Sequence, residues 1–68
     1  MNERLKLLRK MLNLSQEDFG KRVGVSNTAI SKLEKAERNV TDQMILSICR
    51  EFNVNEHWLR TGEGDMFL

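Results

Sequence analysis

Proline is absent from the 68 residues, and cysteine, histidine and tryptophan occur once each. A single cysteine excludes an internal disulfide framework, and a lone histidine without clustered cysteines leaves no ligand set for a metal. No apolar run approaches the roughly 18 residues that a membrane-spanning helix needs. The chain starts with a charged, amphipathic segment that is unlike a signal peptide. We therefore expect a helical, cytoplasmic domain with no metal, no other cofactor, no catalytic residue and no membrane contact.

The net charge of +1 is unevenly distributed along the chain. Residues 1–38 hold nine Lys and Arg against five Asp and Glu, a charge of +4, whereas residues 39–68 hold two against five, a charge of −3. A dipolar molecule of this kind presents its first half to a polyanion and keeps its second half away. The distribution therefore indicates a nucleic acid partner more clearly than the net charge does.

Four junctions, at residues 13–15, 24–26, 39–41 and 53–55, share one pattern: Asn or Gly, then an aliphatic residue, then a capping residue. The Asn or Gly can take the left-handed conformation that ends a helix, and the third residue can cap the next helix. Each aliphatic residue can pack on an apolar side chain four positions beyond the cap. The pattern predicts a single all-α domain, residues 1–68, of five short helices. They are expected at about 3–12, from 16 to a turn at 24–25, and at about 26–35, 42–52 and 56–61.

The predicted third helix has two different faces. Successive residues lie about 100° apart around a helix, which places Ala29, Ile30 and Leu33 together on an apolar side. The opposite side carries only hydrogen-bonding residues, two of them lysines and none acidic: Asn27, Thr28, Ser31, Lys32 and Lys35. Such a face suits base edges flanked by phosphates. An ordinary solvated face is the alternative, and the surrounding residues decide between the two.

Those surrounding residues have the spacing of a helix-turn-helix over about 16–35. Apolar side chains stand where two helices must pack: Phe19, Val23, Val25, Ile30 and Leu33. Gly20 is small where the helices must approach closely, and Gly24 can end the first of them in the left-handed conformation. The motif resembles that of the Cro/phage-repressor (xenobiotic-response-element) helix-turn-helix family. The resemblance runs from Leu5 to Met66 and includes Arg9, Leu33-Glu34 and the segment 53–59.

The resemblance implies a lambda-repressor-like, sequence-specific regulator of transcription, a repressor of phage or mobile-element type, that binds a double-stranded DNA operator. The third helix would enter the major groove and contact bases through Asn27, Thr28, Ser31 and Lys32. Phosphate contacts are expected from Ser15, Gln16, Ser26, Lys35, Arg38 and Asn39. The resemblance also implies that Arg9 and Glu34 pair and bridge the first and third helices. With Gly24, and Gln16 as a further brace, they are expected to hold the third helix in place.

One such helix covers only a few base pairs, so a weak homodimer, formed mainly on palindromic DNA, is expected. The contact is assigned to the end of the chain: His57, Trp58, Met66, Phe67 and Leu68. For Trp58 a place in the core is the leading alternative. The last three residues also fit a disordered end or the edge of a longer protein.

Two other functions compete with DNA binding. One is an antitoxin-like interaction module that keeps the fold and binds a regulatory protein partner. Such a module would have no need of the acid-free face on the third helix, so DNA binding is favoured. An enzyme ranks third, because Cys49 and His57 have no evident catalytic partners and no paired carboxylates stand beside a base.

Overall fold

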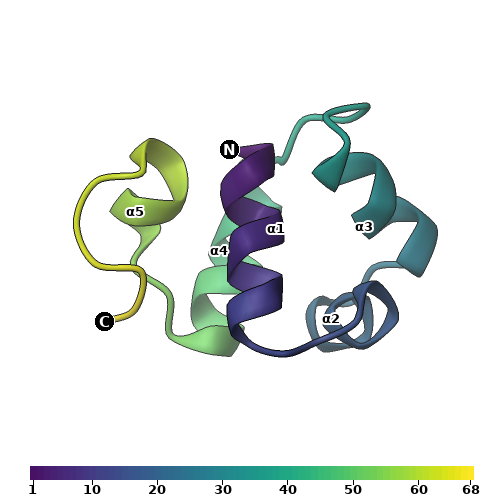
Figure 1. Ribbon diagram of the computed structural model, residues 1–68, viewed down its shortest axis with the longest axis horizontal. Helices are drawn as coiled ribbons and strands as arrows, with labels where there is room; N and C mark the ends of the chain where they lie inside the picture. The colour runs from purple at the N-terminus through teal and green to yellow at the C-terminus, as the bar shows by residue number, and fades with distance from the viewer.

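The computed structural model describes residues 1–68 and contains five helices: α1 (Asn2–Met11), α2 (Gln16–Val23), α3 (Asn27–Glu34), α4 (Asp42–Phe52) and α5 (Glu56–Thr61). The prediction of an all-α, five-helix domain is confirmed, and the predicted helix ends agree within one residue. Figure 1 shows α1 in the middle in front of α4, with α2 and α3 on one side and α5 and the C-terminus on the other. None of the helices has the length and apolar character to cross a membrane.

Side-chain caps begin four of the five helices, as the junction pattern predicts. Each capping oxygen accepts a hydrogen bond from a backbone N–H in the first turn; the caps are Ser15, Ser26, Thr41 and Asn55. A left-handed residue stands at three of the four junctions: Asn13, Gly24 and Asn53. The chain therefore turns sharply at these points, which brings successive helices against one core.

The junction before α4 differs from the prediction. Its left-handed residue is Ala36, with φ of 62°, and Asn39 does not have a positive φ. The N–H of Ala36 donates to the carbonyl of Leu33 at 3.2 Å, and the N–H of Glu37 donates to that of Lys32 at 2.9 Å. Because these two bonds close the helix directly behind its last turn, the chain reverses at 36. The predicted end of the third helix near 35 holds, but the prediction that Asn39 takes the left-handed conformation at this junction is wrong.

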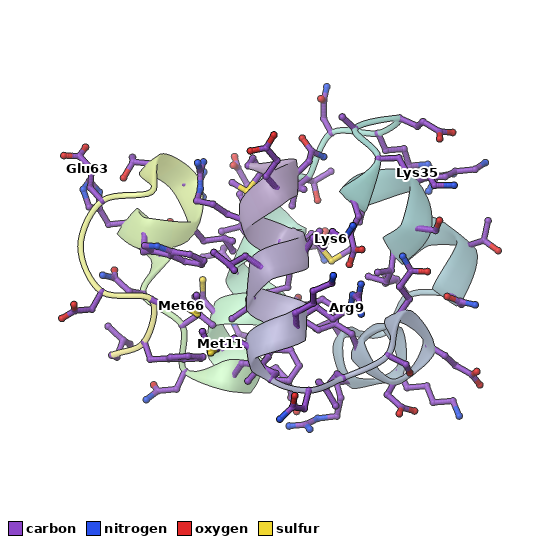
Figure 2. The ribbon with its side chains drawn as sticks, viewed as in Figure 1. Lys6, Arg9, Met11, Lys35, Glu63 and Met66 are labelled. Carbon is purple, nitrogen blue, oxygen red and sulfur yellow. The ribbon has the colours of Figure 1, made fainter.

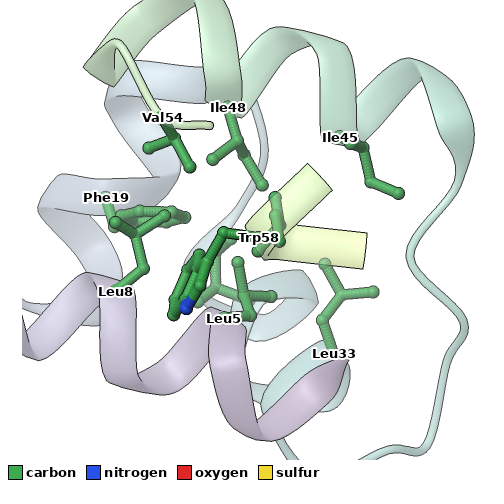
Figure 3. Packing of buried hydrophobic residues seen from close by; sticks show 10 residues of the cluster. Leu5, Leu8, Phe19, Leu33, Ile45, Ile48, Val54 and Trp58 are labelled. Atoms are coloured by element: carbon green, nitrogen blue, oxygen red, sulfur yellow. The ribbon is translucent and has the colours of Figure 1, made fainter. Parts of the chain in front are cut away.

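One core of ten buried apolar side chains joins all five helices (Figure 3): Leu5, Leu8, Phe19, Ile30, Leu33, Ile45, Ile48, Val54, Trp58 and Leu59. The aliphatic residues of the other junctions, Leu14, Val25 and Val40, are half-buried against it. Trp58 is only 7% exposed, so its ring belongs to the core and offers little surface to a second protein. This outcome removes Trp58 from the expected dimer contact.

The last residues of the chain are docked on the domain, although no strand was expected there. The N–H of Asn55 donates to the carbonyl of Met66 at 2.9 Å, and the N–H of Leu68 donates to that of Asn53 at 3.1 Å. These bonds form a short antiparallel pairing of 66–68 with 53–55. Met66 is half-buried against the core, whereas Leu68 is 81% exposed. Of the alternatives for these residues, the disordered end is therefore not what the structure has.

Candidate nucleic-acid interface

The turn between α2 and α3 is set by two glycines with different roles. Gly24 has a φ of 81°, and a Cβ added there would meet no atom within 4 Å. Glycine is therefore favoured at 24 by the left-handed backbone conformation alone, and not by a lack of space. A Cβ added at Gly20 would lie 2.5 Å from the carbonyl oxygen of Val25, and the N–H of Val25 donates to the carbonyl of Gly20 at 2.8 Å. The turn thus packs directly on α2 and fixes where α3 begins.

The outer side of α3 borders a shallow hollow with a volume of about 330 Å³ and no apolar lining residue. Seven residues line it: Gln16, Asn27, Thr28, Ser31, Lys32, Lys35 and Glu37. The structure therefore brings together all four residues expected to contact bases and two of those expected to contact phosphate. The remaining expected phosphate contacts, Ser15, Ser26, Arg38 and Asn39, are exposed but lie outside the hollow. The carboxylate of Glu37 was not anticipated, because it follows the helix rather than belonging to it.

Positive charge on this surface is not neutralised within the molecule. Lys32, Lys35 and Arg38 are exposed and have no carboxylate within 4.0 Å, whereas Arg22 on α2 pairs with Glu51 at 2.7 Å. Free cations beside a hollow of hydrogen-bonding groups are suited to a polyanion that also presents base edges.

A bridge between Arg9 and Glu34 holds the end of α3 against α1. Arg9 Nε donates to Glu34 Oε2 at 2.6 Å and Nη2 donates to Oε1 at 3.1 Å, while Nη1 donates to the carbonyl of Leu14 at 2.9 Å. Gln16 at the start of α2 also donates to Glu34 Oε1, at 3.1 Å. The side chains of Arg9 and Glu34 are 12% and 3% exposed. One carboxylate therefore joins three helices, and Figure 2 shows Arg9 extending from α1 toward α3.

The ionisation of Glu34 follows from this arrangement. Burial acts to raise the pKa of the carboxyl, but the hydrogen bonds from Arg9 and Gln16 and the charges of Arg9 and Lys6 act in the opposite direction. The second group prevails, and the pKa of Glu34 lies below its ordinary value. Glu34 is consequently ionised at neutral pH.

A second tie between α1 and the end of α3 had no signal in the sequence. The side-chain amide of Asn2 donates to the carbonyl of Leu33, and also to that of Arg38 at 3.2 Å. One amide thus connects the first turn of α1 to the last turn of α3 and to the loop that carries Arg38 and Asn39. A lone Asn near the start of a helix gives no indication of partners more than 30 residues away.

The fold and this surface together define a helix-turn-helix domain. A family model described as "Helix-turn-helix" matches residues 5–59, and the chain belongs to this Cro/C1-type family. The resemblance inferred from the sequence is therefore confirmed.

Individual relatives include a phage repressor and a bacterial antitoxin. Repressor protein C2 of Salmonella phage P22 is 35% identical over 63 residues, 93% of this chain and 29% of that protein. Antitoxin PezA of Streptococcus pneumoniae is 34% identical over 55 residues, 81% of this chain and 35% of that protein. The crystal structure of the P22 c2 repressor with a synthetic operator has a TM-score of 0.80 and 34% identity, covering 91% of this chain and 94% of that one. The chain spans about a third of the length of the two relatives.

Proposed function

We propose that the domain binds a double-stranded DNA operator and regulates transcription as a repressor, with α3 in the major groove. The observation that carries this proposal is the hollow beside α3, which is lined by seven polar or charged side chains, two of them lysines that form no ion pair. The P22 repressor, which shares the fold, was solved with a synthetic operator. That relative supports the same docking for this chain.

The side chains of α3 have the chemistry that base edges require. An Asn amide can form two hydrogen bonds with adenine N6 and N7, and a lysine can donate to guanine O6 and N7. Asn27 and Lys32 are both exposed on the hollow, so both are free to make such contacts. The hydroxyl of Thr28 can bond to any base, and its methyl group can contact that of thymine. Ser31, which is half-buried, completes the set.

Phosphate groups would be bound at the two helix starts and in the loop after α3. The hydroxyls of Ser15 and Ser26 accept from backbone N–H groups, which leaves each hydroxyl proton to donate to phosphate. Gln16 lies beside the free amides at the start of α2, where an anion is stabilised. Arg38 and Asn39 lie in the loop, and the loop is tied to α1 through Asn2.

Selection of bound sequences from a random duplex library tests this function directly. The expected result is a palindromic motif. Lys32→Ala or Asn27→Ala should then cost about 1–3 kcal/mol on the selected site and little on random duplexes. Lys21→Ala is the matched control, because Lys21 pairs with Glu17 on α2 and is absent from the hollow. Equal losses on both kinds of duplex would show that Lys32 and Asn27 contact phosphate only.

A weak homodimer formed mainly on DNA completes the proposal. Two domains on a two-fold axis can contact half-sites about one helical turn, roughly 34 Å, apart. Figure 1 places α3 and the C-terminus at opposite ends of a molecule whose longest extent is 29 Å. Pairing through the exposed His57, Phe67 and Leu68, next to half-buried Met66, would keep both α3 helices free for DNA. Analytical ultracentrifugation should show monomers alone and two protomers per palindromic duplex; one protomer per duplex would refute the dimer.

A protein-interaction module is the second candidate, and the similarity to antitoxin PezA favours it. In that case the library selection would return no motif. The exposed surface of α3 would then bind a regulatory protein instead.

A further inference from the structure

Glu37 is the only carboxylate among the residues that line the hollow. It is exposed, it forms no ion pair, and its side chain makes no hydrogen bond, although Lys32 and Lys35 line the same hollow. Four other exposed acids, Glu3, Asp18, Glu63 and Asp65, also form no ion pair, but none of them lines the hollow. Glu37 therefore presents a free acceptor beside the groups proposed to contact DNA.

The backbone holds Glu37 in a fixed position relative to α3. Its N–H donates to the carbonyl of Lys32 at 2.9 Å, and the left-handed residue Ala36 turns the chain back toward the helix. Asn2 ties down the following residue, Arg38, through its carbonyl. Because the loop is bonded on both sides of Glu37, its backbone is fixed at the edge of the hollow before any ligand arrives, and the free side chain extends from there.

A carboxylate at this place has opposite effects on different DNA sequences. Close to phosphates it is repelled, which weakens binding to every duplex. Where it meets a hydrogen-bond donor it is stabilised, and the donors of the major groove are the exocyclic amino groups of cytosine (N4) and adenine (N6). Thymine and guanine present acceptors at the equivalent places, and these repel an anion further.

We propose that Glu37 is a specificity-determining residue that accepts a hydrogen bond from the amino group of cytosine or adenine at the edge of the operator half-site. Its charge also lowers the affinity for all other sequences. The inference rests on the proposed DNA-binding function. Glu37 would then be the only negatively charged hydrogen-bond acceptor among contact residues that are otherwise neutral or cationic.

The test compares Glu37→Ala with wild type in the same random-duplex selection and in competition binding. One position of the motif, filled by cytosine or adenine with wild type, should become degenerate. The preference for the selected site over random duplexes should fall roughly 5- to 150-fold, the equivalent of one good base contact. Binding to random duplexes should not fall, and should rise by up to about fivefold because a surface charge is removed. Circular dichroism checks folding, which the loss of an unbonded side chain should preserve.

Glu63→Gln is the matched control, since it removes the same charge from the other end of the molecule. Figure 2 shows Glu63 far from Lys35, on the opposite side of α1. If Glu37→Ala and Glu63→Gln both raise binding to selected and random duplexes by the same factor, Glu37 acts only through net charge and the inference is wrong. An unchanged motif with Glu37→Ala also overturns it. A wild-type protein that selects no motif instead overturns the proposed function.

Discussion

Removing the carboxylate of Glu34 should destabilise the domain far more than the loss of a surface charge. In Glu34→Ala, Arg9 keeps its guanidinium where the side chain is only 12% exposed, and both Nε and Nη2 lose their acceptor. The amide of Gln16 loses an acceptor as well. Breaking a buried pair by removing one partner costs about 3–5 kcal/mol. A domain of this length has a free energy of unfolding of only about 3–10 kcal/mol, so the variant should lose a large part of its stability.

Urea denaturation followed by circular dichroism measures this loss. The matched variant replaces both partners, Arg9→Met with Glu34→Leu, and leaves no buried charge. It should recover most of the stability, because apolar replacement of a buried pair is often neutral. If Glu34→Ala alone costs less than about 1 kcal/mol, the bridge behaves as a solvated surface pair and the reasoning is refuted.

The pH dependence of the bridge has a definite sign. The pKa of Glu34 is lower in the folded domain than its ordinary value of 4.5, so the unfolded chain takes up this proton first as the pH falls. The stabilisation is therefore fully present above about pH 4.5 and is lost as the pH falls through the folded-state pKa. The stability difference between wild type and Glu34→Gln should be largest at neutral pH and shrink in acid. A difference that stays constant down to about pH 3 would contradict the assignment.

Further substitutions test the left-handed backbone at two positions, the tie between Asn2 and the loop, and the phosphate contact of Arg38. Gly24→Val should cost about 1–2 kcal/mol or more through left-handed strain alone, whereas Ala36→Gly should stabilise by up to about 1 kcal/mol because it relieves the same strain; thermal melts of the two variants should therefore shift in opposite directions. Asn2→Ala should speed hydrogen exchange of the amides at 35–39 and weaken all duplexes about equally, and unchanged exchange there would show that the tie to Arg38 is dispensable. Arg38→Ala should lower the salt dependence of DNA binding by about one unit, and an unchanged slope would remove it from the interface.

The helices were predictable because their boundaries are set locally. A left-handed residue, an aliphatic residue and a cap act within three positions, so four junctions could be recognised without any knowledge of the fold. The prediction for the junction at Asn39 was wrong for a reason that is also local. The N–H groups of Ala36 and Glu37 bond to the carbonyls of Leu33 and Lys32 and close α3 before Asn39 is reached. That closure imposes the left-handed conformation on Ala36, a residue with no preference for it.

The polar ties were harder to predict because they join residues distant in sequence. Arg9 and Glu34 were paired only through the family resemblance, and nothing in the spacing alone requires that contact. The amide of Asn2 reaches backbone carbonyls, which every residue has, so no pattern of side chains can indicate its partners. The pairing of 66–68 with 53–55 is also made between backbone groups, and three terminal residues are too few to show a strand period.

These ties explain how so short a helix can present a fixed surface. α3 has eight residues, a length at which an isolated helix is unstable in water, so its orientation must come from its neighbours. Its start is fixed by the cap at Ser26 and the close contact of the turn with Gly20. Its end is held by two α1 side chains, Asn2 and Arg9, and neither lies in the hollow. Because α1 thus sets the angle at which α3 leaves the core, substitutions at Asn2 or Arg9 should alter DNA affinity without direct contact with a base.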